Sequence, residues 1–180
     1  MPQPRKPRRS ARSRKAGKFG KSSKQSKTFF PQKKGLSLRP YQPQDEPFLI
    51  ALTLDQMKAV YESSVGEELT PELVRMQLRD CETTVIEWDG RPVGYSAMMS
   101  YGQGRQYWGA LVLSEEAQGK GVGQQLVQHV VQQAKQQGVR WVDGHVQTDN
   151  RKALRFWLRN GFQIVGRPQA GSFPISRRVV

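Results

Sequence analysis

Residues 112–126 read VLSEEAQGKGVGQQL, and this stretch decides the fold more than any other part of the chain. The apolar residues at its start indicate the end of a strand, and the pattern Gly-x-Gly-x-Gly from Gly119 to Gly123 leads into a segment with helical spacing. Glycines let a backbone approach a ligand closely and accept positive φ, while a helix N-terminus presents unpaired N–H groups with partial positive charge. The stretch therefore predicts an anion site suited to a pyrophosphate, to which Lys120 adds charge.

This glycine loop differs from two common phosphate loops. The dinucleotide fingerprint requires Gly-x-Gly-x-x-Gly, and the P-loop ends in Gly-Lys-Ser/Thr, so neither pattern is present. Taken alone, the loop is also compatible with a simple glycine turn between a strand and a helix. Its neighbours in the sequence therefore decide how it is interpreted.

The hydrophobic spacing along the rest of the chain indicates alternating strands and helices. The predicted strands cover residues 36–39, 83–88, 92–99, 107–113, 141–146, 162–166 and 176–180, and the predicted helices cover 45–61, 71–80, 121–138 and 150–159. Asp89-Gly90 predicts a tight hairpin turn, and Thr70 followed by Pro71 predicts a capped helix start. This order predicts a mixed α/β fold with one central sheet.

Charge divides the chain into two parts. Residues 1–35 contain 13 Lys or Arg and no Asp or Glu, whereas the other 145 residues hold 16 basic and 15 acidic side chains. The basic segment is of low complexity and buries too little apolar surface to offset its ordering entropy. We expect a disordered basic tail at 1–35 and one domain at 36–180. Counterion release predicts that the tail contacts RNA, a ribosome or DNA, and a solubilising extension is the alternative.

Composition also indicates the cellular compartment in which the protein is expected. Cys81 is the only cysteine, which excludes an intrachain disulfide and a cysteine-rich metal site and favours a reducing compartment. No apolar run of about 18 residues and no signal-peptide h-region is present. We expect a cytoplasmic protein with no metal site and no membrane contact, and we leave its oligomeric state open.

Two motifs in correct mutual spacing resemble the GCN5-related N-acetyltransferase (GNAT) superfamily. Gln118–Gly123 matches the signature Gln/Arg-x-x-Gly-x-Gly/Ala. Residues 150–162, NRKALRFWLRNGF, resemble the second block, which runs Asn-x-x-Ala, then an aromatic residue, then Gly-Phe. The resemblance covers about residues 36–180. It implies a GNAT-type fold, in which a mixed, splayed central β-sheet is flanked by helices.

The resemblance implies acetyl-CoA as the cosubstrate, held where the sheet splays. In the family, the pantetheine arm pairs with the strand before the loop, the pyrophosphate lies on the loop amides, and the motif asparagine bonds near the pantetheine. The implied cofactor-binding residues are Ala110, Leu111, Val112, Leu113, Gln118, Gly119, Lys120, Gly121, Val122, Gly123 and Asn150.

The implied reaction is direct attack of a primary amine on the thioester, and an ammonium must first lose a proton to a base. In members that resemble the ribosomal-protein N-terminal acetyltransferases, that base is a glutamate five residues before the motif asparagine; here the position is His145. Imidazole titrates near neutral pH and is a competent base, with Asp143 as a candidate to orient it. A water-relayed base elsewhere is the alternative.

The family's usual acid is a tyrosine seven residues after the motif asparagine, and here that position is Trp157. Indole donates a hydrogen bond but has no accessible acidity, so coenzyme A would leave as the thiolate or Trp157 would only pack. Weaker candidates for acceptor contacts are Tyr95, Tyr101, Tyr107, Glu67, Glu68 and Glu72.

Two functions from different classes therefore remain. The first is an N-acetyltransferase acting on a protein N-terminus, a lysine or a small-molecule amine. The second is a non-catalytic acetyl-CoA-sensing or nucleic-acid-binding module with a degenerate acetyltransferase fold. The missing tyrosine favours the second function, and the complete Gln118–Gly123 loop favours the first.

Overall fold

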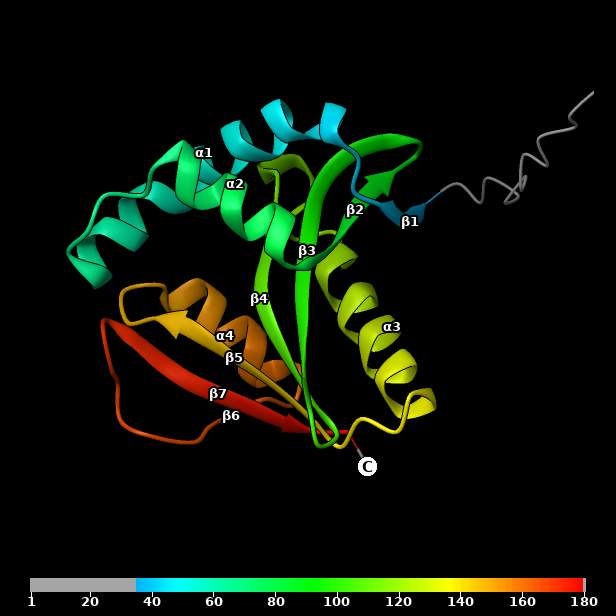
Figure 1. The fold of residues 1–180 in the computed structure, drawn as a ribbon, viewed down its shortest axis with the longest axis vertical. Helices are drawn as coiled ribbons and strands as arrows, with labels where there is room; N and C mark the ends of the chain where they lie inside the picture. The colour runs from blue at the N-terminus through cyan, green and yellow to red at the C-terminus, as the bar shows by residue number, and fades with distance from the viewer. Residues whose placement is uncertain (1–34, 180) are drawn as a thin grey trace, which may run out of the picture. The chain divides into compact units, whose positions relative to one another are not determined.

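The computed structural model describes residues 35–179, so the expected tail lies outside the described residues except for Gly35. Within this range the chain forms a seven-stranded sheet in the order β1-β2-β3-β4-β5-β7-β6. Every neighbouring pair is antiparallel except β4 and β5, which are parallel. The mixed α/β architecture expected from the sequence is confirmed (Figure 1).

The strands and helices follow the predicted order. The strands are β1 (Leu36–Pro40), β2 (Glu82–Trp88), β3 (Arg91–Gly102), β4 (Arg105–Leu113), β5 (Trp141–Gln147), β6 (Gln163–Ile164) and β7 (Ser172–Arg178). The α-helices are α1 (Glu46–Val65), α2 (Pro71–Asp80), α3 (Val122–Gln136) and α4 (Arg151–Arg159), and two short 3-10 turns, η1 (Pro43–Asp45) and η2 (Glu115–Ala117), precede α1 and α3.

Two hydrophobic cores lie on opposite faces of the sheet. The first core joins the sheet to α3 and α4 and includes Val142, Leu126 and Trp157. The second core joins the sheet to α1 and α2 and includes Tyr95 and Leu78. Because the helices cover both faces, they hold the central strands β3, β4 and β5 in fixed positions around the candidate site.

The local sequence signals explain where several elements begin and end. The Thr70 hydroxyl accepts a hydrogen bond from the Leu73 N–H at 3.3 Å, which is the expected N-cap of α2. Asp89 and Gly90 both have positive φ, 49° and 76°, as a type I′ hairpin turn requires. Helix α1 ends at Gly66, which adopts the left-handed conformation.

Several predicted boundaries were wrong. Helix α1 continues four residues beyond Tyr61, and Gly66 was the signal for its true end. Strands β3 and β4 extend toward each other and join through a tight turn at Gln103, which has a positive φ of 53° between two glycines. Strand β7 starts at Ser172 rather than at 176; Pro174 lies within it and contributes its carbonyl, which accepts from the Val165 N–H at 3.0 Å.

No helix in residues 35–179 is both long and apolar enough to span a membrane. In the same range, no three side chains of His, Cys, Asp or Glu come together in a way that could hold a metal ion.

Candidate active site

The central feature of the site is a split between β4 and β5. The two strands pair only from Arg105 with Trp141 to Trp108 with Gly144. Beyond that point β4 pairs only with β3, and β5 only with β7. In Figure 1 the two strands meet near the bottom of the view and diverge above it. The expected splay is confirmed, and it leaves backbone N–H and C=O groups that a ligand can satisfy.

The split begins at two glycines. A side chain at Gly144 would lie 3.3 Å from the Trp108 carbonyl oxygen, so glycine lets the strands approach closely just before they separate. On the other side, the β3–β4 register shifts between Ala97 and Met98, which leaves Gly109 as the extra residue of a β-bulge. The bulge turns β4 away from β5. The segment of β4 expected to hold pantetheine, from Ala110 to Leu113, therefore begins directly after the bulge.

Two side chains already hold backbone carbonyls beside this bulge. The Gln77 amide of α2 donates to the Gly109 carbonyl at 3.2 Å. The Trp108 indole N–H donates to the Ala110 carbonyl at 3.0 Å. These bonds fix the start of the open edge, and no local pattern of residues predicts either of them because both depend on the bulge.

The loop expected to bind pyrophosphate leads from β4 through η2 to α3. Gly119 and Gly121 have positive φ of 73° and 80°, which residues with a Cβ rarely adopt. Gly121 is the N-cap of α3, so the first-turn amides from Val122 onward have no intrahelical acceptor. A Cβ at Gly123 would lie 3.1 Å from the Phe156 ring, so this glycine allows α3 to pack against α4. This geometry suits a bound phosphate.

Gln118 has a role that its motif did not reveal. Its side-chain amide donates to the Gln56 side chain and to the Leu113 carbonyl, both at 2.8 Å, and its oxygen accepts from the Lys152 ammonium. The side chain therefore ties the loop to α1, β4 and α4. Lys120, by contrast, lines a hollow of about 370 Å³. Residues of the β2–β3 hairpin, such as Asp89, also line this hollow.

Asn150 caps α4. Its side-chain oxygen accepts from the Ala153 N–H at 3.0 Å, which explains why helix α4 starts at Arg151 rather than at Asn150. The side-chain NH₂ of a capping asparagine still carries two donors. The residue follows the C-terminal end of β5, the strand that forms one side of the split, by three residues.

His145 lies on β5 next to the point where the split opens, and it is exposed. Its Nδ1 is 3.0 Å from the Tyr107 hydroxyl. Burial raises the pKa of the Tyr107 phenol, and the neighbouring Tyr101 and Cys81 side chains raise this pKa further. The phenol is therefore neutral at physiological pH, and its oxygen can accept from an Nδ1–H, which would leave the Nε2 lone pair of His145 to take a proton.

Asp143 does not orient His145 in the way the sequence suggested. Both of its carboxylate oxygens accept from the Arg105 guanidinium, at 2.7 and 2.8 Å, and one also accepts from the Ser176 hydroxyl at 2.6 Å. Tyr107 is the residue that contacts the imidazole. The sequence signal for this contact is a tyrosine two residues after Arg105, on the strand parallel to the one that carries His145. This signal can be recognised only once the pairing of β4 with β5 is known.

Trp157 is packed in the core. It is 9% exposed, and its ring makes edge contacts with Trp108 at 4.9 Å and Phe162 at 4.8 Å between centroids. Phe156 adds a third edge contact at 5.2 Å. Of the roles considered for this residue, the geometry supports packing: the aromatic cluster anchors α4 beneath the start of the split.

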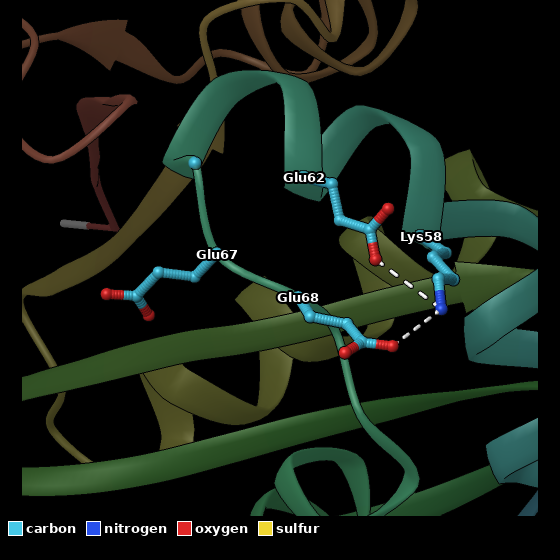
Figure 2. Close-up of a pocket in the computed structure, with 5 residues that line it drawn as sticks. Lys58, Glu62, Glu67 and Glu68 are labelled. Carbon is cyan, nitrogen blue, oxygen red and sulfur yellow. Dashed lines mark hydrogen bonds and ion pairs between the residues drawn. The ribbon is translucent and has the colours of Figure 1, made fainter.

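A hollow of about 340 Å³ lies at the end of α1 and is lined by Glu67 and Glu68, two of the weaker candidates for acceptor contacts (Figure 2). Lys58 bridges Glu62 at 3.5 Å and Glu68 at 3.1 Å, so its one positive charge offsets only one of these two carboxylates. Glu67 points away from them in Figure 2. Near the end of α1, the Gly171 backbone lies against the Ser64 carbonyl so closely that a Cβ would be 1.8 Å from it. The loop before β7 is therefore held against α1.

Solved structures share this fold. PaiA N-acetyltransferase from Thermoplasma acidophilum, in complex with coenzyme A, is 15% identical, with a TM-score of 0.64 over 79% of this chain and 98% of that one. An acetyltransferase from Thermus thermophilus is 25% identical, with a TM-score of 0.64 over 80% of this chain and 97% of that one. The fold is thus that of the N-acetyltransferases.

Residues 49–162 match the family model described as Acetyltransferase (GNAT) family, and the chain belongs to that family. The expected class, an acetyltransferase with acetyl-CoA as its cosubstrate, is confirmed by this membership.

A sequence relative is matched over a much shorter segment. A tRNA(Met) cytidine acetyltransferase, TmcA, of Saccharolobus islandicus is 42% identical over 52 residues, which is 29% of this chain. The match spans only 7% of the length of that relative. It therefore compares one segment of two proteins and not their whole architectures.

Proposed function

We propose that this protein transfers the acetyl group of acetyl-CoA to a primary amine by direct attack, with His145 as the base. The observation that carries this proposal is the position of the Tyr107–His145 pair, 3.0 Å apart, where the β4–β5 split begins. A ligand lying in the split from the loop at Gly121 would end beside this pair. Acetyl-CoA supplies an activated thioester there.

The residues that would hold acetyl-CoA are those named from the sequence. The open edge of β4, Ala110 to Leu113, offers backbone partners to pantetheine amides, and the glycine loop and first turn of α3 suit the pyrophosphate. Asn150 follows β5, the strand on the other side of the split from β4. Nε2 of His145 would accept the proton of the incoming ammonium. Because Trp157 is buried in its aromatic cluster, we propose that coenzyme A leaves as the thiolate.

The acceptor is a protein N-terminus, a lysine, a small-molecule amine or an amine carried by RNA. The last possibility follows from the segment shared with the tRNA(Met) cytidine acetyltransferase. We also propose that residues 1–35, with 13 positive charges, tether the 36–180 domain to RNA, a ribosome or DNA in the cytoplasm. Apart from Gly35 this segment lies outside the described residues, so its support is compositional.

A coenzyme A release screen across these acceptor classes tests the activity. His145→Gln should lower the rate by about 10²-fold or more, the usual contribution of a general base. His129→Gln on α3 is the matched control, because His129 is exposed and the only other histidine. Equal rates for the two variants would remove His145 from the mechanism.

Binding of acetyl-CoA separates an enzyme from a non-catalytic module. A ligand at 100 times its Kd stabilises the folded state by about 2.7 kcal/mol, so acetyl-CoA should raise the melting temperature of the full chain and of His145→Gln alike. Stabilisation without release of coenzyme A from any acceptor class would support the acetyl-CoA-sensing module. Absence of stabilisation would contradict acetyl transfer and acetyl-CoA sensing and would favour the nucleic-acid-binding module with a degenerate acetyltransferase fold.

A further inference from the structure

The sheet face opposite α3 and α4 carries aromatic and basic side chains, and the proposed reaction uses only two of them, Tyr107 and His145. Side chains alternate along a strand, so alternate residues of β4 and β5 share this face, while Val142 and Val146 point into the opposite core. Helices α1 and α2 cover the face around Tyr95 and Val112. The side chains beyond that cover are Tyr101, Arg105, Tyr107, Trp141, His145 and Arg178.

Three of these rings form a continuous row. The Tyr101 and Tyr107 ring centroids are 5.7 Å apart, and the Tyr107 and His145 centroids are also 5.7 Å apart. Tyr101 is 58% exposed, which is a large fraction for an aromatic side chain of this size. The row runs from the β3–β4 hairpin to the point where the β4–β5 split begins.

The charge beside the row is positive. The Arg105 guanidinium lies over the Trp141 ring, 5.6 Å from its centroid, and also binds Asp143, so the charges of Arg105 and Asp143 compensate one another. Arg178 pairs with Trp141 across the β5–β7 ladder and is exposed. The exposed Tyr101 ring and the half-buried Trp141 ring, with the exposed Arg178 beside Trp141, complement a polyanion that carries flat bases.

We propose that this face binds single-stranded nucleic acid, with bases stacked on Tyr101 and Trp141 and a phosphate beside Arg178. Aromatic side chains on an open sheet are a common means of stacking unpaired bases, and such stacking tolerates any sequence because every base has a π-face. The inference goes beyond the tail contact proposed above, because it places bases against the folded domain and next to His145.

Photo-crosslinking of the full chain locates the contact directly. Single-stranded 12-mers of RNA containing 4-thiouridine and of DNA containing 4-thiothymidine are irradiated with the protein, and the crosslinked peptides are identified by mass spectrometry. We expect adducts on peptides that contain Tyr101 or Trp141, and the stronger of the two arms identifies the natural nucleic acid. Adducts confined to residues 1–34 would overturn the proposal.

Fluorescence anisotropy with the same oligomers measures the energetic role of the rings. Tyr101→Ala and Trp141→Ala should each weaken binding about fivefold or more, the range for loss of one stacked base, while the salt dependence stays unchanged because no charge is removed. Tyr101→Phe should bind like the unmodified protein. Phe48→Ala, which removes a ring on α1 that is 39% exposed, is the matched control.

Two outcomes of these binding measurements would contradict base stacking on this face. Equal affinity of Tyr101→Ala and Phe48→Ala would overturn the proposal, as would an equal loss of affinity for a duplex of the same sequence. Tyr101 is mostly exposed, so its alanine variant is expected to fold even if Trp141→Ala does not. Stabilisation of Tyr101→Ala by acetyl-CoA confirms its folding and also separates failure of this surface from failure of the proposed acetyl transfer.

Discussion

At the residue scale, the hydrogen bond between Tyr107 and His145 determines which imidazole nitrogen can serve as the base. If Nδ1–H donates to the phenol oxygen, Nε2 carries the lone pair, whereas the opposite tautomer would place a proton there. The raised pKa of Tyr107 keeps the phenol neutral and able to accept. Tyr107 is therefore a positioning residue in the proposed mechanism.

Tyr107→Phe tests this role. Loss of one neutral hydrogen bond, worth about 1 kcal/mol, should lower kcat roughly fivefold to tenfold and leave the KM for acetyl-CoA unchanged. The ¹⁵N shifts of the imidazole should move toward a mixture of the two tautomers, which a purely structural role would not produce. Tyr101→Phe is the control, and unchanged ¹⁵N shifts in Tyr107→Phe would contradict the assignment.

A second residue-scale prediction concerns stability and pH. Asp45 accepts two hydrogen bonds of 2.7 Å from the Arg39 guanidinium and one of 2.9 Å from the Gln42 N–H. The bonds from Arg39 hold the pKa of this carboxyl below its usual value. Since the folded state lowers the pKa, Asp45 stabilises the protein above the unfolded-state pKa of about 4 and loses this effect as the pH falls through the folded value.

Asp45→Asn should therefore destabilise the protein by about 2 kcal/mol at pH 7, the loss of its charge-assisted hydrogen bonds. Urea denaturation of the two proteins from pH 7 down to pH 2 measures the difference. The gap between their unfolding free energies should close below pH 4. A gap that stays constant with pH would mean that the charge of Asp45 does not contribute.

At the element scale, the end of β4 is fixed by how closely β3 approaches it. A Cβ at Gly94 would lie 2.2 Å from the Val112 carbonyl oxygen and 3.1 Å from the Leu113 Cα. These are backbone atoms of the edge proposed to hold pantetheine, so they cannot move without displacing that edge. Gly94 of β3 thus positions the end of the neighbouring strand β4.

Gly94→Ala should destabilise the protein by about 2–3 kcal/mol, as overpacking of a core does, and should reduce stabilisation by acetyl-CoA. Ser96→Ala, two residues along β3, is the control. The Ser96 hydroxyl is buried and has no partner among the described residues, so its removal should be neutral or stabilising by up to about 1 kcal/mol. Thermal unfolding with and without acetyl-CoA measures both, and normal acetyl-CoA stabilisation in Gly94→Ala would contradict the prediction.

At the scale of the whole molecule, the charge is unevenly divided between the tail and the domain. Of the 29 Lys and Arg residues, 13 precede residue 36, while the acidic residues all follow it. Each phosphate neutralised on a single strand contributes about 0.7 to the slope of log K against log salt concentration. The tail should therefore dominate the salt dependence of nucleic-acid binding.

Removal of residues 1–34 should lower that slope by at least about 3, equivalent to four or five released phosphate contacts. Binding of the full chain and the truncated chain to a single-stranded oligomer, measured between 50 and 300 mM salt, gives the two slopes. Co-sedimentation with ribosomes should fall in parallel. Equal slopes would show that the tail does not contact phosphate and favour a solubilising extension.

The sequence by itself determined the family, the order of the elements and the glycine loop. These features depend on local chemistry: alternation and helical spacing, the Thr70 and Asn150 caps, and the positive φ of Gly119 and Gly121. Even so, the function of Gln118 was missed, because its partners lie on α1, β4 and α4 and meet only after folding.

The tertiary structure alone decided what surrounds the reacting position. Tyr107 and His145 are 38 residues apart and meet because β4 and β5 are parallel neighbours for only four residue pairs. The same pairing brings Asp143 into contact with Arg105. Trp157 packs against Trp108, which lies in the last β4–β5 pair before the split. Contacts between strands distant in the chain depend on register and bulges, which no local pattern of residues encodes.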